Sequence, residues 1–166
     1  MTALNRLLAP NRFTARALDT IQPLFALGTR VYVGWQFFKS GWLKVGSWDQ
    51  TIGLFENEYR TPLLSPTLAA VLGTFGELAF PLFVWLGLYG RLSALGLFAV
   101  NAMAVISYAH VLLSEGFEAA IGQHILWGFM LAMLAIYGPG KLSLDYLLGR
   151  QVARADGTAG TGVVAI

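Results

Sequence analysis

Four runs of mainly apolar residues constrain the fold of this chain more than any other feature. They cover residues 20–42, 67–88, 92–113 and 121–137. A helix of about 20 such residues, rising ~1.5 Å per residue, crosses the ~30 Å hydrocarbon core of a bilayer. The composition agrees, because 56% of the residues are hydrophobic and only 12% are charged, about half the charged share of soluble proteins. The sequence therefore predicts an all-α integral membrane protein, a four-helix bundle with short interfacial helices.

The segments around these runs complete the predicted organisation. Residues 1–19 carry three arginines between short apolar pieces and no small-residue cleavage site, which predicts a retained interfacial segment. Residues 45–66 form the longest connection, and long connections often carry function. Residues 142–148 are expected to form a short interfacial helix with Ser143 as its N-cap. We expect one domain over residues 1–150, followed by a flexible cytoplasmic tail over residues 151–166.

Several functional classes are excluded by what the sequence lacks. It contains no cysteine, which excludes disulfides, thiolate metal sites, iron–sulfur clusters and dithiol redox chemistry. The formal net charge is only +2 and the basic residues are scattered, so no basic stripe is present for nucleic acid. No nucleotide-binding or acyl-transfer motif occurs in the chain. Any redox role must therefore depend on groups other than sulfur.

Positive charge is divided unequally between the two sides of the predicted bundle. The side that holds both termini carries Arg6, Arg12, Arg16, Arg91, Lys141, Arg150 and Arg154. The opposite side carries Lys44 and Arg60 among Asp49, Glu56, Glu58, Glu115 and Glu118. Lysine and arginine accumulate in cytoplasmic loops, so we place both termini in the cytoplasm and the protein in the bacterial inner membrane. The connection 45–66 is then expected in the periplasm of a Gram-negative cell.

Three polar residues are expected deep within the predicted spans. Counting from the span ends places Arg30, Glu77 and Asn101 near the middle of the bilayer. A lone charge at that depth costs roughly 2.5–3.5 kcal/mol, which predicts that Arg30 and Glu77 form a bidentate salt bridge with Asn101 nearby. The alternative is that this pair only fixes the register of the helices.

A stripe of residues extends this polar group along the first span. At ~100° per residue, Gly34, Phe37, Gly41 and Lys44 lie on the same side of a helix as Arg30. The two glycines are expected to allow a neighbouring helix to approach closely. The predicted polar core of the bundle therefore consists of Arg30, Glu77, Asn101 and Lys44, whereas Lys39 lies on the opposite side of the first span.

The two histidines are not equivalent. Both are expected near the outer ends of their spans, where an imidazole can ligate a metal or haem or accept a proton from a quinol. Nine residues separate Asn101 from His110, so these two residues lie on opposite sides of a helix and Tyr108 takes the inward position. His124 is therefore the better candidate, although two histidines without a bridging carboxylate form a weak metal signal. The alternative is a histidine whose polar atoms are satisfied by water at a helix start.

These positions predict a pocket that opens on the outer side. It would be lined by Lys44, Glu77, Trp48 and His124, and it would suit a quinone head group or a similar small polar ligand. The candidate ligand-binding residues are Lys44, Trp48, Glu56, Tyr59 and His124. The alternative is a sealed bundle in which these groups satisfy one another.

The pattern of these residues is similar to that of a known family. The relevant residues are Arg30, Gly34, Phe37, Gly41 and Lys44 in the first run, Glu77 in the second, Gly87 and Arg91 at the following turn, and residues 138–145 after the fourth. Together they resemble the DoxX family of small four-helix membrane proteins, over roughly residues 30–148. Residues 37–41 and 54–64 resemble a bacterial subgroup that is associated with metal-stress or peptide-modifying proteins.

This resemblance implies a functional context without one agreed reaction. It implies an inner-membrane subunit or accessory of a redox, metal-stress or oxidative-stress system, with quinone or haem as conceivable cofactors. The alternative is a non-enzymatic scaffold or transport accessory, which docks a periplasmic or membrane protein partner through the acidic loop 45–66. Whether the protein is an enzyme stays open at this stage.

Overall fold

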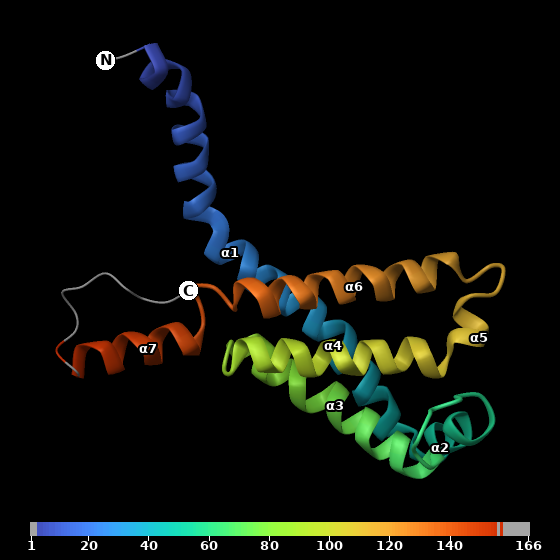
Figure 1. The fold of residues 1–166 in the computed structure, drawn as a ribbon. Coiled ribbons are helices and arrows are strands. Elements are labelled where there is room, and N and C mark those ends of the chain that lie inside the picture. The colour runs from blue at the N-terminus through green and yellow to red at the C-terminus, as the bar shows by residue number, and fades with distance from the viewer. Residues whose placement is uncertain (1–2, 156, 158–166) are drawn as a thin grey trace.

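The computed structural model describes residues 3–155 and residue 157, and these residues form helices without any strand (Figure 1). The helices are α1 (Ala3–Gly46), α2 (Trp48–Asn57), α3 (Pro66–Leu86), α4 (Gly90–Ser107), α5 (Ala109–Leu112), α6 (Glu118–Tyr137) and α7 (Leu144–Ala155). The prediction of an all-α protein is therefore confirmed. The predicted loop 45–66 is largely helical, because α2 occupies its first half.

Three helices, α3, α4 and α6, are long and apolar enough to cross a membrane. They correspond to the last three predicted spans. The first predicted span, residues 20–42, lies within α1 and is not among these three helices. Its crossing of the membrane therefore stays a prediction.

The third predicted span is shorter than expected. It was expected to continue to residue 113, but α4 ends at Ser107 and the separate short helix α5 follows. The backbone N–H of Arg60 donates to the Ser107 carbonyl at 2.8 Å. The Val111 N–H, which would continue the helix by donating to this carbonyl, donates to the Tyr108 carbonyl at 3.1 Å instead, so the regular pattern of α4 ends at Ser107.

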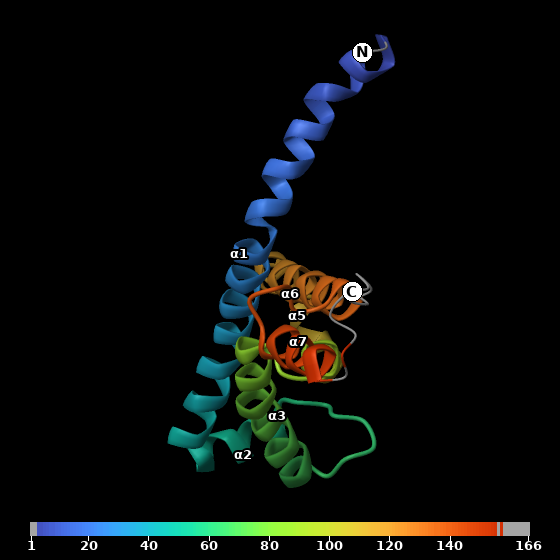
Figure 2. The same cartoon turned by 90° about the vertical axis from the view of Figure 1, so that its left-hand side faces the viewer.

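Helix α1 has two halves with different surroundings. At ~1.5 Å per residue its 44 residues extend about 66 Å. Both views show the N-terminal half of α1 projecting away from the other helices (Figures 1 and 2), while its C-terminal half packs along α3. Residues 3–19 are thus continuous with the helix that packs on α3, and their predicted place at the membrane interface stays a prediction.

Close packing of α1 on α3 depends on the predicted glycines. A Cβ atom added at Gly41 would lie 2.9 Å from Leu78 Cγ and 3.0 Å from Glu77 Cβ, and one added at Gly34 would lie even closer to the Trp85 ring. The prediction that these glycines allow close helix approach is confirmed. A second pair, α4 and α6, packs together on the other side, and α3 contacts α4. The buried core between the pairs consists of Val33, Phe37, Val84, Ala94, Leu97, Leu131 and Leu134.

The two ends of this bundle are built differently, and we name them by their helices. The α7 end contains the α3–α4 turn, residues 138–143 and α7, while the α2 end contains α2, α5 and the connections beside them. The Ser143 hydroxyl accepts a hydrogen bond from the Tyr146 N–H, which confirms Ser143 as the N-cap of α7. Residues 151–155 belong to α7 and not to a flexible tail, and the rest of that predicted tail, apart from residue 157, lies outside the described residues.

Candidate functional site

Arg30 lies at the α7 end of the bundle and not at its middle. Its side chain is 1% exposed and donates to the carbonyls of Trp85 at 2.8 Å, Val84 at 3.3 Å and Leu142. The last carbonyls of a helix have no intrahelical partner and attract cations. Arg30 therefore caps α3 and ties it to the segment before α7.

The predicted salt bridge between Arg30 and Glu77 is therefore wrong. The apolar run predicts that the first helix joins the bundle at residue 20, whereas α1 packs on α3 only from about Arg30 onward. Within the described residues the carboxylate of Glu77 pairs with Lys44 instead. Asn101, which was expected beside Arg30 and Glu77, pairs with His124.

A carboxylate completes the α7 end. Asp145 accepts hydrogen bonds from the N–H groups of Tyr89 at 2.8 Å and Gly90 at 2.7 Å, so it caps the N-terminus of α4. Gly87 has a φ of 62°, and a side chain there would collide with Ser143. The sequence pattern of residues 138–145 gave a hint of this role, because an acidic residue follows a glycine-rich turn, but its target could not be read from the sequence.

The Lys44–Glu77 ion pair lies toward the α2 end. The Lys44 Nζ atom is 2.5 Å and 2.6 Å from the two carboxylate oxygens of Glu77, and 3.4 Å from Ser40 Oγ. The two side chains are 15% and 8% exposed. A carboxylate has about four lone-pair positions, so Glu77 can still accept a hydrogen bond from another group.

Asn101 and His124 form the second polar pair. The Asn101 amide Nδ2 donates to the backbone carbonyl of His124 at 2.9 Å, and its Oδ1 lies 2.8 Å from His124 Nδ1. An amide oxygen only accepts hydrogen bonds, so this assignment of the amide gives His124 a protonated Nδ1. In the neutral imidazole, Nε2 is then an acceptor, and it has no hydrogen-bond partner among the described residues.

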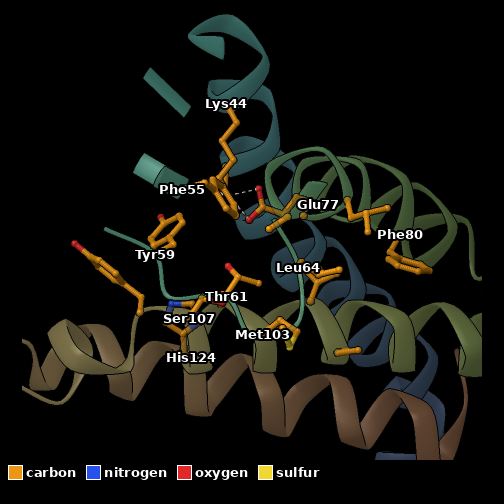
Figure 3. A pocket seen from close by; sticks show the side chains of 18 of the residues that line it. Lys44, Phe55, Tyr59, Thr61, Leu64, Glu77, Phe80, Met103, Ser107 and His124 are labelled. Atoms are coloured by element: carbon orange, nitrogen blue, oxygen red, sulfur yellow. Dashed lines mark hydrogen bonds and ion pairs between the residues drawn. The ribbon is translucent and has the colours of Figure 1, made fainter. Parts of the chain in front are cut away.

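A cavity of about 420 Å³ lies between these two pairs (Figure 3). Lys44, Tyr59, Glu77 and His124 line it, and so does Tyr108, as predicted for the inward residue. Its apolar lining includes Phe55, Leu64, Leu72, Phe80, Val100, Met103 and Leu112. Figure 3 shows Lys44 and Glu77 on one side of the cavity and His124, the lining residue that belongs to α6, on the opposite side. Trp48 and Glu56, which were also predicted to bind a ligand, are exposed and do not line the cavity.

Two aromatic rings form the rim of this cavity. The rings of Tyr59 and Tyr108 meet edge to face with centroids 5.0 Å apart, and the Tyr108 hydroxyl donates to Glu58 at 3.2 Å. Burial, followed by the negative charge of Glu77, raises the pKa of Tyr59. The phenol of Tyr59 therefore stays protonated beyond the ordinary range and remains a hydrogen-bond donor.

The structure offers little to a metal ion. Among the described residues, no three histidine, aspartate or glutamate side chains lie close enough together to hold one. His110 is exposed, packs edge-on against Tyr108 and lines neither described cavity. His124 therefore has no second imidazole beside it in the cavity.

Fold and site together define a class: an all-α, multi-pass integral membrane protein. Its bundle is held by capping contacts at the α7 end and encloses a cavity toward the α2 end. The sequence profile of DoxX matches residues 25–115, which is more than half of the chain. The chain therefore belongs to the DoxX family. No curated protein and no solved structure gives a significant match. His124 and Asp145 lie beyond the residues that the family profile matches.

Proposed function

We propose that this protein is a membrane subunit or accessory of a redox or stress-response system, and that its cavity binds the head group of a quinol. The observation that carries the proposal is the arrangement of hydrogen-bond acceptors on two opposite sides of a mainly apolar cavity. The Glu77 carboxylate lies on one side and His124 Nε2 on the other. The volume of about 420 Å³ lies in the range of small-molecule sites, about 300–1,000 Å³.

The protonation of these groups favours the reduced ligand. A quinol has two hydroxyl groups on opposite sides of its ring, and each can donate a hydrogen bond to one acceptor of the cavity. An oxidised quinone has two carbonyl oxygens, which would face the lone pairs of Glu77 and His124. We therefore expect a preference for quinol over quinone. The hydroxyl of Thr61 also lines the cavity and lacks a partner among the described residues, so it is available to a ligand.

Haem and metal binding have weaker support than quinol binding. A haem would require His124 as an axial ligand, but this histidine is the only imidazole that lines the cavity in the described part of the chain. A quinol uses the histidine, the carboxylate and the apolar walls together. An absorption spectrum of the purified protein distinguishes these ligands, because only haem gives a Soret band.

Direct titration tests the proposed ligand. The full chain in mild detergent would be titrated with a short-chain quinol analogue and with its oxidised form, using tryptophan fluorescence, since Trp127 packs against His124 with centroids 5.0 Å apart. His124→Gln should weaken quinol binding about tenfold or more through the loss of one hydrogen bond. His110→Gln is the matched control and should leave the affinity unchanged. Equal affinities of the two variants, or no binding by the native chain, would contradict the proposal.

We also propose that the α2 end faces the periplasm and that the α7 end faces the cytoplasm. The cation count carries this orientation, and two of the cytoplasmic cations, Arg91 and Arg150, belong to α4 and α7 at the α7 end. A reporter that is active only outside the cytoplasm, fused to the C-terminus, should give no signal. A strong signal would reverse the orientation.

The second candidate function is docking of a periplasmic protein partner by the segment 45–66. Its acidic residues Asp49 and Glu56 are exposed, and Leu63 is fully exposed with a φ of 66°. An exposed leucine in a segment that also carries exposed carboxylates fits a partner with a basic surface and an apolar pocket. The double variant Glu56→Lys and Leu63→Ser should abolish co-purification of such a partner while leaving quinol binding unchanged. Loss of quinol binding in this variant would assign the segment to the cavity instead.

A further inference from the structure

The N-terminal half of α1 is an amphipathic helix without a protein partner in the described structure. Every side chain from Asn11 to Gln22 is exposed, and Phe13 and Phe25 are 76% and 77% exposed. This part of α1 largely precedes residues 25–115, which match the DoxX profile. Its role therefore does not follow from membership of the family.

The exposed residues are sorted by chemistry around the helix. At ~100° per residue, the large apolar side chains fall within an arc of ~140°. These are Phe13, Leu18, Ile21, Leu24 and Phe25, and Thr14 and Ala17 lie in the same arc. The charged and amide side chains fall within an arc of ~140° on the other side, and they are Asn11, Arg12, Arg16, Asp19 and Gln22, with Ala15 and Pro23 among them. Such a pattern is typical of a helix that lies in the interface of a membrane.

The level at which this part of α1 leaves the bundle, measured along the membrane-crossing helices, agrees with an interfacial position. Arg30, where α1 joins the bundle, donates to the carbonyls of Val84 and Trp85, which belong to the last turn of the membrane-crossing helix α3. The ends of such helices lie at the surface of the hydrocarbon core. The residues that precede Arg30 therefore leave the bundle at the level of a lipid surface.

The direction of the helix agrees as well. α4 and α6 run across Figure 1, whereas the N-terminal half of α1 runs steeply across their direction, and Figure 2 shows the same half rising above the other helices. Pro23 removes one backbone hydrogen bond and favours a bend, and Figure 1 shows α1 bending between its two halves. A helix that leaves at surface level and runs across the bundle follows the plane of the membrane.

We propose that residues 11–25 lie in the surface of the leaflet at the α7 end, with the phenylalanines among the acyl chains and with Arg12 and Arg16 against anionic lipid phosphates. Two arginines and one aspartate on the polar side give it a net positive charge, which is complementary to anionic head groups. The partner is thus an anionic lipid surface and not a second copy of the chain.

Spin labels on single cysteines test this proposal, because the chain has no cysteine of its own. Phe13→Cys, Leu18→Cys and Ile21→Cys report the apolar side, and Asn11→Cys, Asp19→Cys and Gln22→Cys are the matched polar positions. The full-length protein would be placed in bilayers of phosphatidylcholine with phosphatidylglycerol. Labels on the apolar side should collide with oxygen, and labels on the polar side should collide with a water-soluble nickel complex.

Two patterns would overturn the proposal. Equal access of nickel to all six labels would place the helix in water, and shielding of the apolar labels from both reagents would place it against protein. The charge is tested separately with Arg12→Gln and Arg16→Gln in bilayers with and without phosphatidylglycerol. Each change should shift the equilibrium between the lipid-bound and the free helix about fivefold in the anionic bilayer only. Equal shifts in both bilayers would contradict the recognition of anionic lipid.

Discussion

The two ends of the packed part of α1 hold similar chemistry and use it differently. At the α7 end, Arg30 donates to three backbone carbonyls and Asp145 accepts from two backbone N–H groups. At the α2 end, Lys44 and Glu77 pair beside a cavity, and His124 presents an imidazole to the same cavity. Buried charge alone thus does not locate a binding site. The distinguishing feature is whether the buried polar groups are used up by the fold or face a space that a ligand can enter.

The largest effect is expected from removal of Arg30. Arg30→Ala leaves the carbonyls of Trp85 and Leu142 without this donor, while that of Val84 keeps the Gly87 N–H, and it should lower the free energy of unfolding by about 1–3 kcal/mol for each carbonyl left unpaired. Thermal unfolding in detergent measures this loss. The control is Arg91→Ala, because Arg91 is an exposed arginine that also donates to a helix-end carbonyl, that of Ile136 at 2.7 Å, and its removal should cost less than about 1 kcal/mol. Equal losses would show that burial of Arg30 adds nothing to the capping of helix-end carbonyls.

A smaller effect is expected at the ion pair. Glu77→Gln leaves the Lys44 ammonium largely buried without its carboxylate, and should destabilise the protein by about 1–3 kcal/mol. The double variant Lys44→Met with Glu77→Gln should be less destabilised than the single variant, since no unpaired charge remains. Lys39→Met is the control, because Lys39 is exposed. A double variant that is worse than Glu77→Gln alone would refute the pairing.

Removal of the Asn101 amide, which orients His124, should lower stability by a still smaller amount. Asn101→Ala removes both contacts with His124 and should lower stability by about 0.5–1.5 kcal/mol. Its specific signature is spectroscopic, because nitrogen NMR should show His124 protonated at Nδ1 in the native protein and a mixture of tautomers in the variant. Gln123→Ala changes an exposed amide beside the histidine and should leave the spectrum unchanged. A native spectrum with the proton on Nε2 would contradict the assigned acceptor.

The smallest effect is expected in how stability depends on pH through Tyr59, at the rim of the cavity. Because burial and the Glu77 carboxylate raise the pKa of Tyr59, the stability that its protonated form contributes is complete below the ordinary tyrosine pKa, about 10. This contribution is lost as the pH rises through the higher pKa of the folded protein. The difference in phenolate absorbance between the native protein and Tyr59→Phe should therefore titrate above the ordinary tyrosine value. Titration at or below that value would contradict a buried phenol.

The sequence predicted the helical class and the family because both depend on patterns along the chain. Runs of apolar residues predict helices, and the spacing of Gly34 and Gly41 predicts the close side of α1. The N-cap at Ser143 was also readable, since it depends on neighbours a few residues away. The lining of a cavity by Lys44, Glu77 and His124 was anticipated from their expected heights in the bundle.

The partners of the buried charges could not be predicted, since they depend on how far each helix slides along its neighbour. The apolar run from residue 20 gave no sign that α1 would join the bundle only near Arg30. Because of that shift, Glu77 pairs with Lys44 and not with Arg30, and Asn101 pairs with His124. Carbonyl groups carry no sequence signature, so the capping role of Arg30 was invisible before the structure.

The most direct test of the contrast between the two ends measures stability and quinol affinity on the same two variants. Arg30→Lys should lower the unfolding temperature, because an ammonium cannot reach three carbonyls at once, while its folded fraction should bind the quinol analogue with native affinity. His124→Gln should keep the unfolding temperature close to the native value and weaken binding about tenfold or more. The opposite pattern, with native binding in His124→Gln and weakened binding in folded Arg30→Lys, would contradict the assignment of the ligand to the α2 end.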